Sequence, residues 1–218
     1  SALFTFGFKA LTGSTPIRRW PLFLGWLAAT GATGAVGCAL PLLKTLGYDY
    51  SHLISLVSSA GAGHLAACYP HRVASRQARF PGARLTAAVL YLRSLSLGLL
   101  LLVIPLALAI LNRYRVPPCN EAEGLQFFFL MPVCAVVIAT ALGLFCGVLL
   151  PKAGLSSALW FALVLGSFVA AFYTFYSTPA VFVFGPLFGY FPGVLYDELV
   201  RVETRLVTYR AATLAQTA

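Results

Sequence analysis

The strongest constraint on this chain is one long apolar run, Leu85 to Leu111, which follows directly after a basic stretch. The run has 27 residues and a single charged side chain, Arg93. A bilayer core about 30 Å thick requires roughly 20 apolar residues in a helix, so this run is long enough to cross. The preceding stretch, Tyr69–Arg84, contains four arginines and no acid, and such residues favour the cytoplasmic side. The run therefore predicts a transmembrane helix with a defined direction.

Composition extends this interpretation to the whole chain. Of the 218 residues, 60% are hydrophobic and 10% are charged, whereas soluble domains carry about 25% charged residues. The apolar runs are continuous, which favours helices over the short alternating segments of a barrel. The net charge of +9 comes from basic residues between these runs, where topology control and lipid headgroups explain it without a nucleic-acid partner. We predict an all-α, polytopic helical membrane protein with about five transmembrane helices plus an outer amphipathic helix.

The sequence divides into three parts. Residues 1–19 are aromatic and basic and predict an amino-terminal segment on the membrane surface, and residues 20–184 predict the bundle. Residues 185–218 predict an extracytoplasmic loop rich in Gly and Pro, followed by an amphipathic helix over Leu195–Leu214. The five predicted transmembrane segments are residues 20–43, 51–68, 85–111, 126–150 and 158–184.

The second segment, residues 51–68, is the most polar of the five. It contains His52 and four serines, which indicates burial among other helices instead of contact with lipid. An amino terminus in the cytoplasm places most basic residues in cytoplasmic segments and all six acids outside. Five crossings then put the carboxyl terminus outside, provided that residues 51–68 cross.

Small residues at helical spacing predict close helix contacts, because they let two backbones approach. Gly143 and Gly147 form a GxxxG pair in the fourth segment, and small residues recur every fourth position from Ala158 to Thr174 in the fifth. The glycines that we predict in helix packing are Gly34, Gly63, Gly143, Gly147 and Gly166.

Arg93 is the charged residue inside a predicted transmembrane segment. Such a charge is a candidate functional group by default, although an arginine side chain also reaches the interface by snorkelling or takes a structural partner. We predict that Arg93, together with Arg84 and Arg79 in the basic stretch, contacts lipid or another anion.

Two adjacent acids, Asp197 and Glu198, begin the predicted outer helix. Side chains one residue apart on a helix point about 100° apart, so the pair favours helix capping and an ion pair with Arg201 over joint catalysis. The outer residues that we predict to face a partner are Tyr190, Tyr196, Asp197 and Glu198.

Histidines and cysteines give little indication of a cofactor. His64 is the candidate ligand for a haem or a chlorophyll magnesium, but a bis-histidine site needs a facing histidine from another helix, and no other predicted segment has one. His71 lies in the basic stretch and is expected to be solvated. The five cysteines have no CxxC spacing, and no hydrolase or phosphate-binding motif is present. We therefore predict no catalytic residues, cofactor or metal.

One part of the chain resembles a group of known sequences. The stretch NRYRVPPCNEAEGLQFFFLMPV, the later GPLFGYFPGVLYDE and the final LVTYRAATL resemble uncharacterised bacterial polytopic membrane proteins over residues 110–215. In those proteins an extracytoplasmic portion follows a similar PGxLYDE segment. The resemblance implies a membrane location and an outer segment, and it carries no active-site residues.

Three functions are compatible with these features. The first is a non-enzymatic integral membrane subunit or anchor, with membrane lipids and other membrane subunits as partners. The second is a transporter permease or channel component, in which the polar face of residues 51–68 lines a path. The third is a membrane enzyme that acts on lipid through Arg93 and outer acids. Packing of residues 51–68 against the first segment favours the first function, and a continuous cavity along them favours the second.

Overall fold

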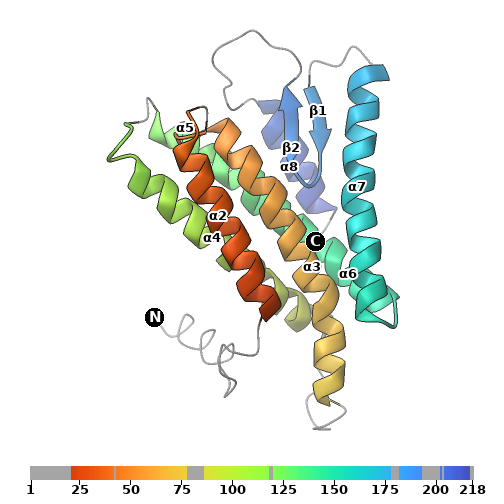
Figure 1. The fold of residues 1–218 in the computed structure, drawn as a ribbon. Coiled ribbons are helices and arrows are strands. Elements are labelled where there is room, and N and C mark those ends of the chain that lie inside the picture. The colour runs from red at the N-terminus through yellow and green to blue at the C-terminus, as the bar shows by residue number, and fades with distance from the viewer. Residues whose placement is uncertain are drawn as a thin grey trace.

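The computed structural model describes residues 21–41, 43–77, 86–117, 120–177, 182–192, 202 and 204–216. Successive long helices run in alternating directions through one bundle, and a small hairpin and a last helix lie at one end of it (Figure 1). The elements are α2 (Pro21–Ala39), α3 (Tyr48–Gln77), α4 (Ala87–Asn112), α5 (Glu121–Phe128), the π-helix η2 (Phe129–Val133), α6 (Cys134–Leu149), α7 (Ala153–Ser177), β1 (Phe182–Gly185), β2 (Gly189–Pro192) and α8 (Thr204–Ala215).

Within the described ranges, four helical segments are long and apolar enough to cross a membrane. They are Pro21–Ala39, Ala87–Asn112, Glu121–Leu149 and Ala153–Ser177. The mainly helical structure agrees with the predicted fold class. The predicted count of five transmembrane helices is not confirmed, because α3 is too polar to be counted with these four.

The third of these segments, Glu121–Leu149, starts earlier than the predicted segment 126–150 and contains a π-helical turn. Asn120 caps α5, because its side-chain oxygen accepts a hydrogen bond from the Glu123 backbone N–H at 3.3 Å. Pro132 then lies in the π-helical turn η2. Proline has no N–H to donate to the carbonyl four residues earlier, and a π-helical turn pairs carbonyls with N–H groups five residues later. The helix therefore continues through Pro132 into α6.

The central element of the bundle is α3, which packs against α2, α4, α6 and α7. Its 30 residues make a helix about 45 Å long. Its polar residues are buried as predicted, since Ser51, Ser55, Ser58 and Ser59 are at most 2% exposed. The serine side chains that lower the mean hydropathy of α3 are thus covered by neighbouring helices instead of facing outward.

The basic stretch Tyr69–Arg84, which lies between two predicted transmembrane segments, was expected to be a loop. This expectation is wrong for its first nine residues, which continue α3 to Gln77. A proline usually ends a helix at the preceding residue, yet Pro70 lies inside α3. Packing explains why the helix continues. A Cβ built on Gly147 of α6 would lie 3.1 Å from Pro70 Cδ, so the two helices meet closely at this proline.

The closest packing in the bundle joins α3 to α6 and α7 through glycines. A Cβ built on Gly143 would lie 2.7 Å from Gly63 Cα, and one built on Gly63 would collide with the Trp160 ring. Trp160 is fully buried and donates from Nε1 to the Ala60 carbonyl at 3.0 Å. Glycine at positions 63 and 143 therefore sets the separation of α3 from its two neighbours.

The fifth predicted segment, residues 158–184, is shifted in the structure. Helix α7 begins at Ala153 and ends at Ser177, and residues 182–184 belong to strand β1 instead. Strand β1 pairs antiparallel with β2, with Phe182 opposite Pro192 and Gly185 opposite Gly189. We call residues Phe182–Pro192 the inserted hairpin, because it lies between α3 and α7 (Figure 1). Residues 185–192 therefore belong to a paired hairpin instead of the predicted loop.

Candidate functional site

The tip of the inserted hairpin is a three-residue turn, Pro186–Phe188, closed by the pair Gly185 and Gly189. Gly189 has a φ of +94°, a conformation that L side chains rarely adopt. Leu187 and Phe188 at the tip are both 3% exposed. The Phe188 ring stacks on Phe168 of α7 with centroids 5.5 Å apart. Phe168 lies nine residues before the end of α7, so the tip reaches about 14 Å along that helix.

Polar side chains of α3 bind backbone carbonyls of the inserted hairpin. The Tyr48 hydroxyl donates to the Tyr190 carbonyl at 2.7 Å, and the Ser55 hydroxyl donates to the Leu187 carbonyl at 3.0 Å. A two-stranded hairpin leaves carbonyls on its outer edges, and each unsatisfied one inside an apolar bundle costs several kcal/mol. The polar face of α3 therefore stabilises a backbone that apolar helices would exclude.

Arg210 of α8 completes this arrangement from the other side. The side chain is 1% exposed, and its Nη1 donates to the Pro186 carbonyl at 2.7 Å. Its Nη2 lies 3.5 Å from the Met131 carbonyl in η2. Within the described residues Nε has no acceptor, and no acid forms a salt bridge with this guanidinium. Arg210 thus joins the hairpin tip to the π-helical turn through main-chain oxygens.

A second contact positions Val202, which precedes α8 in the chain. Glu123 near the start of α5 accepts a hydrogen bond from the Asn120 side-chain amide at 3.1 Å and one from the Val202 backbone N–H at 3.3 Å. Val202 therefore lies at the end of the bundle where α5 begins, and Arg210 lies deeper, beside η2. The face of α8 that carries Leu206 and Arg210 is buried, which agrees with a predicted amphipathic helix in this region.

The sequence prediction did not identify Tyr48, Ser55 and Arg210 as a group. One signal was available: Arg210 lies four residues after Leu206 and therefore on the apolar face of the predicted helix. These side chains bind carbonyls of the inserted hairpin. The short sequence GPLFG predicts a turn there but does not predict the two strands.

Two histidines lie at helix contacts inside the bundle. Trp26 of α2 donates from Nε1 to His64 Nδ1 at 3.1 Å, and the His64 ring meets the edge of Phe161 at 5.1 Å. His64 Nδ1 is thus an acceptor that links α2 to α3. His71, predicted in a solvated loop, is half-buried on α3 and lies 2.9 Å from the Ser156 hydroxyl of α7. The longer α3 carries it to this contact.

The structure places the predicted packing glycines in two different settings. Gly34, Gly63, Gly143 and Gly147 all face atoms of a neighbouring helix or of a side chain from one. Gly166 is different, because it is exposed on α7 and a Cβ built there would meet nothing within 4 Å. The small residues from Ala158 to Thr174 share this outward face. A contact at Gly166 would therefore need a partner outside this chain.

The predicted polar site residues are not brought together. Arg93 is half-buried on α4, one and a half turns from its start. Tyr190 is 3% exposed and packs on Tyr48 with ring centroids 5.2 Å apart, so the prediction that it faces a partner is wrong. The predicted site residues that lie outside the described ranges are Arg79, Arg84, Tyr196, Asp197 and Glu198.

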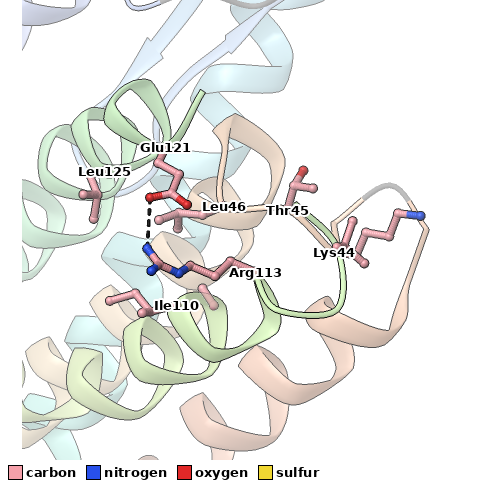
Figure 2. A pocket seen from close by; sticks show the side chains of 9 residues that line it. Lys44, Thr45, Leu46, Ile110, Arg113, Glu121 and Leu125 are labelled. Atoms are coloured by element: carbon pink, nitrogen blue, oxygen red, sulfur yellow. Dashed lines mark hydrogen bonds and ion pairs between the residues drawn. The ribbon is translucent and has the colours of Figure 1, made fainter. Parts of the chain in front are cut away.

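A small cavity of about 120 Å³ lies where α4, α5 and the loop before α3 meet (Figure 2). Its walls include Leu46, Ile110 and Leu125, and Lys44, Arg113 and Glu121 stand at its edge. Arg113 Nη1 lies 3.0 Å from Glu121 Oε2. Contact with Tyr114, followed by the charge of Glu121, raises the pKa of Arg113 above its ordinary value.

Within the described residues, no group of three or more His, Cys, Asp or Glu side chains could hold a metal ion. The four cysteines there, Cys38, Cys68, Cys134 and Cys146, are free thiols. Comparison of the chain with protein-family profiles, with curated proteins and with solved structures found no match.

Proposed function

We propose that this chain is a non-enzymatic integral membrane subunit, or the anchor of a larger membrane assembly or of an extracytoplasmic domain. The observation that carries this proposal is the use of polar side chains inside the bundle. Tyr48, Ser55 and Arg210 all donate to carbonyls of the chain's own backbone. Networks of this kind rigidify a fold, and here they bind the hairpin instead of converging on a substrate.

The same contacts bear on the permease alternative. That function needs the polar face of α3 to line a path through the membrane. Ser55 is instead bonded to the hairpin, and Ser58 and Ser59 bond to carbonyls of their own helix. On the opposite side, Tyr50 packs closely on Gly34 and Gly37 of α2. Packing of this helix supports the structural role.

Charge placement supports an orientation in a bacterial inner membrane. Asp49, Glu121 and Glu123 lie at the end of the bundle where α3 and α5 begin, and the hairpin enters at that end (Figure 1). Arg72 and Lys152 lie toward the opposite end. In the sequence, eight basic residues lie before α2, in the stretch Tyr69–Arg84 and between α6 and α7, whereas the end where α3 and α5 begin has Lys44, Arg113 and Arg115. By the positive-inside rule this excess favours a cytoplasmic amino terminus, and the inserted hairpin then enters from the outer side.

Helix α7 is the surface that we assign to a partner subunit. In its most apolar 18 residues, only 11% are buried within the chain, and the outward face carries the small residues around Gly166. Small residues on one helix face allow a second transmembrane helix to approach closely. A leucine at position 166 therefore blocks such a contact without touching the fold of this chain.

The test is affinity purification of the full chain from membranes in mild detergent. We expect one membrane protein to co-purify in a fixed ratio with the wild type and to be lost in Gly166→Leu. The matched control is Gly25→Leu on α2, where a Cβ likewise meets nothing within 4 Å. The proposal is wrong if the purified chain carries no partner, or if both variants retain the partner equally.

A further inference from the structure

We infer that the cavity at the edge of α4 and α5 binds one phospholipid whose headgroup carries both a phosphate and a primary ammonium. This inference goes beyond the proposed role as a subunit or anchor. It starts from the position of the cavity at the ends of two membrane-spanning segments, Ala87–Asn112 and Glu121–Leu149. Arg113, Tyr114 and Arg115 follow directly after α4, and such residues mark the membrane–water interface.

The walls of the cavity are held in place by two contacts. The Asn112 side chain is 6% exposed and donates to the Lys44 carbonyl at 2.7 Å, which ties the loop before α3 to the end of α4. On the other side, a Cβ built on Gly124 would collide with the Leu46 carbonyl, so α5 lies directly on the same loop. The cavity is therefore formed by packed elements around a defined space.

The lining suits an alkyl chain. Leu46, Ala109, Ile110 and Leu125 supply apolar walls, and Ile110 is 41% exposed on the outer side of α4. Its neighbour Leu111 is 61% exposed, so apolar surface continues from the cavity along the helix. A volume of about 120 Å³ accommodates a few methylene groups of one chain, with the remainder lying along α4.

The charges at the edge suit a headgroup with two opposite charges. Arg113 and Glu121 form an ion pair beside the cavity, and the Lys44 side chain extends away from it (Figure 2). The two paired side chains are 43% and 52% exposed, and ion pairs this exposed contribute little stability. Separating them therefore costs little, and the guanidinium then binds phosphate while the carboxylate binds an ammonium.

This arrangement selects among common phospholipids. Phosphatidylethanolamine offers a phosphate to Arg113 and N–H donors to Glu121. Phosphatidylcholine has a quaternary nitrogen with no N–H, and phosphatidylglycerol has no cation for Glu121. We therefore expect phosphatidylethanolamine to bind with higher affinity than phosphatidylcholine or phosphatidylglycerol.

The test is native mass spectrometry of the purified full chain in mild detergent with equal amounts of these three lipids. We expect preferential retention of phosphatidylethanolamine by the wild type. Glu121→Gln should lower its ratio to phosphatidylglycerol about threefold, the size expected for one half-exposed ion pair. Val116→Phe, which adds bulk at the lining, should lower retention of all three lipids.

Arg115→Gln is the matched control, because Arg115 is exposed at the same end and does not line the cavity. It should leave the preference unchanged, and size-exclusion chromatography checks that every variant is folded. Equal retention of the three headgroups by the wild type would overturn the inference. So would a preference for phosphatidylethanolamine that survives both Glu121→Gln and Val116→Phe.

Discussion

Replacing Gly143 by alanine should push α3 and α6 apart. The added Cβ would lie 2.7 Å from Gly63 Cα and closer still to the Gly63 carbonyl oxygen. Normal contacts to a Cβ are longer than 3.0 Å, and the atoms in the way belong to backbone, so a side-chain rotation cannot relieve the collision. Overpacking of this kind typically costs about 1–3 kcal/mol in the free energy of unfolding.

The matched substitution is Gly166→Ala on α7. Alanine is favoured over glycine in a helix by about 1 kcal/mol, and both variants receive this same gain. A Cβ at position 166 meets nothing within 4 Å. The difference between the two variants therefore isolates the contact of Gly143 with Gly63, and we expect Gly143→Ala to be less stable than Gly166→Ala by about 1–3 kcal/mol.

The assay is reversible unfolding of the purified chain in mixed detergent micelles with increasing SDS, followed by circular dichroism. Equal unfolding free energies for the two alanine variants, within about 0.5 kcal/mol, would refute the reasoning. Helices α3 and α6 would then lie further apart than the glycine contact requires.

Two further predictions concern the inserted hairpin. Tyr48→Phe removes the donor to the Tyr190 carbonyl and should lower the unfolding free energy by about 1–3 kcal/mol, measured as above; an unchanged value would mean that this carbonyl is not buried. Gly189→Ala forces a side chain into a φ of +94° and places its Cβ 3.1 Å from Met131 Cε, so it should destabilise the chain by at least about 1 kcal/mol. Full stability of Gly189→Ala in a thermal unfolding scan would contradict the turn geometry.

Sequence patterns predicted the apolar helices well, because length and hydropathy are local properties. The segments containing α2, α4 and α6 were located to within a few residues at most ends. Helix α3 was underestimated because its polar residues and the basic stretch from Tyr69 indicated a short segment, whereas Pro70 lies inside the helix. In the structure its neighbours enclose those residues and pack against the proline, and no local signal reports that packing.

The candidate site was harder to predict than the helices. The hairpin has only four residues in each strand, and its strands overlap an aromatic, apolar run that reads equally well as the end of a helix. Its stability depends on donors from Tyr48, Ser55 and Arg210, which are up to 142 residues away in the sequence. A pairing over such a separation cannot be read from a single sequence.

The most direct test of this account is the position of the hairpin tip beside α7. In a cysteine-free background, Phe168→Cys and Phe188→Cys are introduced together and treated with the short thiol cross-linker dibromobimane. The stacked rings at these positions predict an efficient cross-link and a strong fluorescence increase, absent from either single variant. A surface hairpin would not reach Phe168, about 14 Å before the end of α7. No cross-link in a folded double variant, with both thiols reactive after unfolding, would contradict the account.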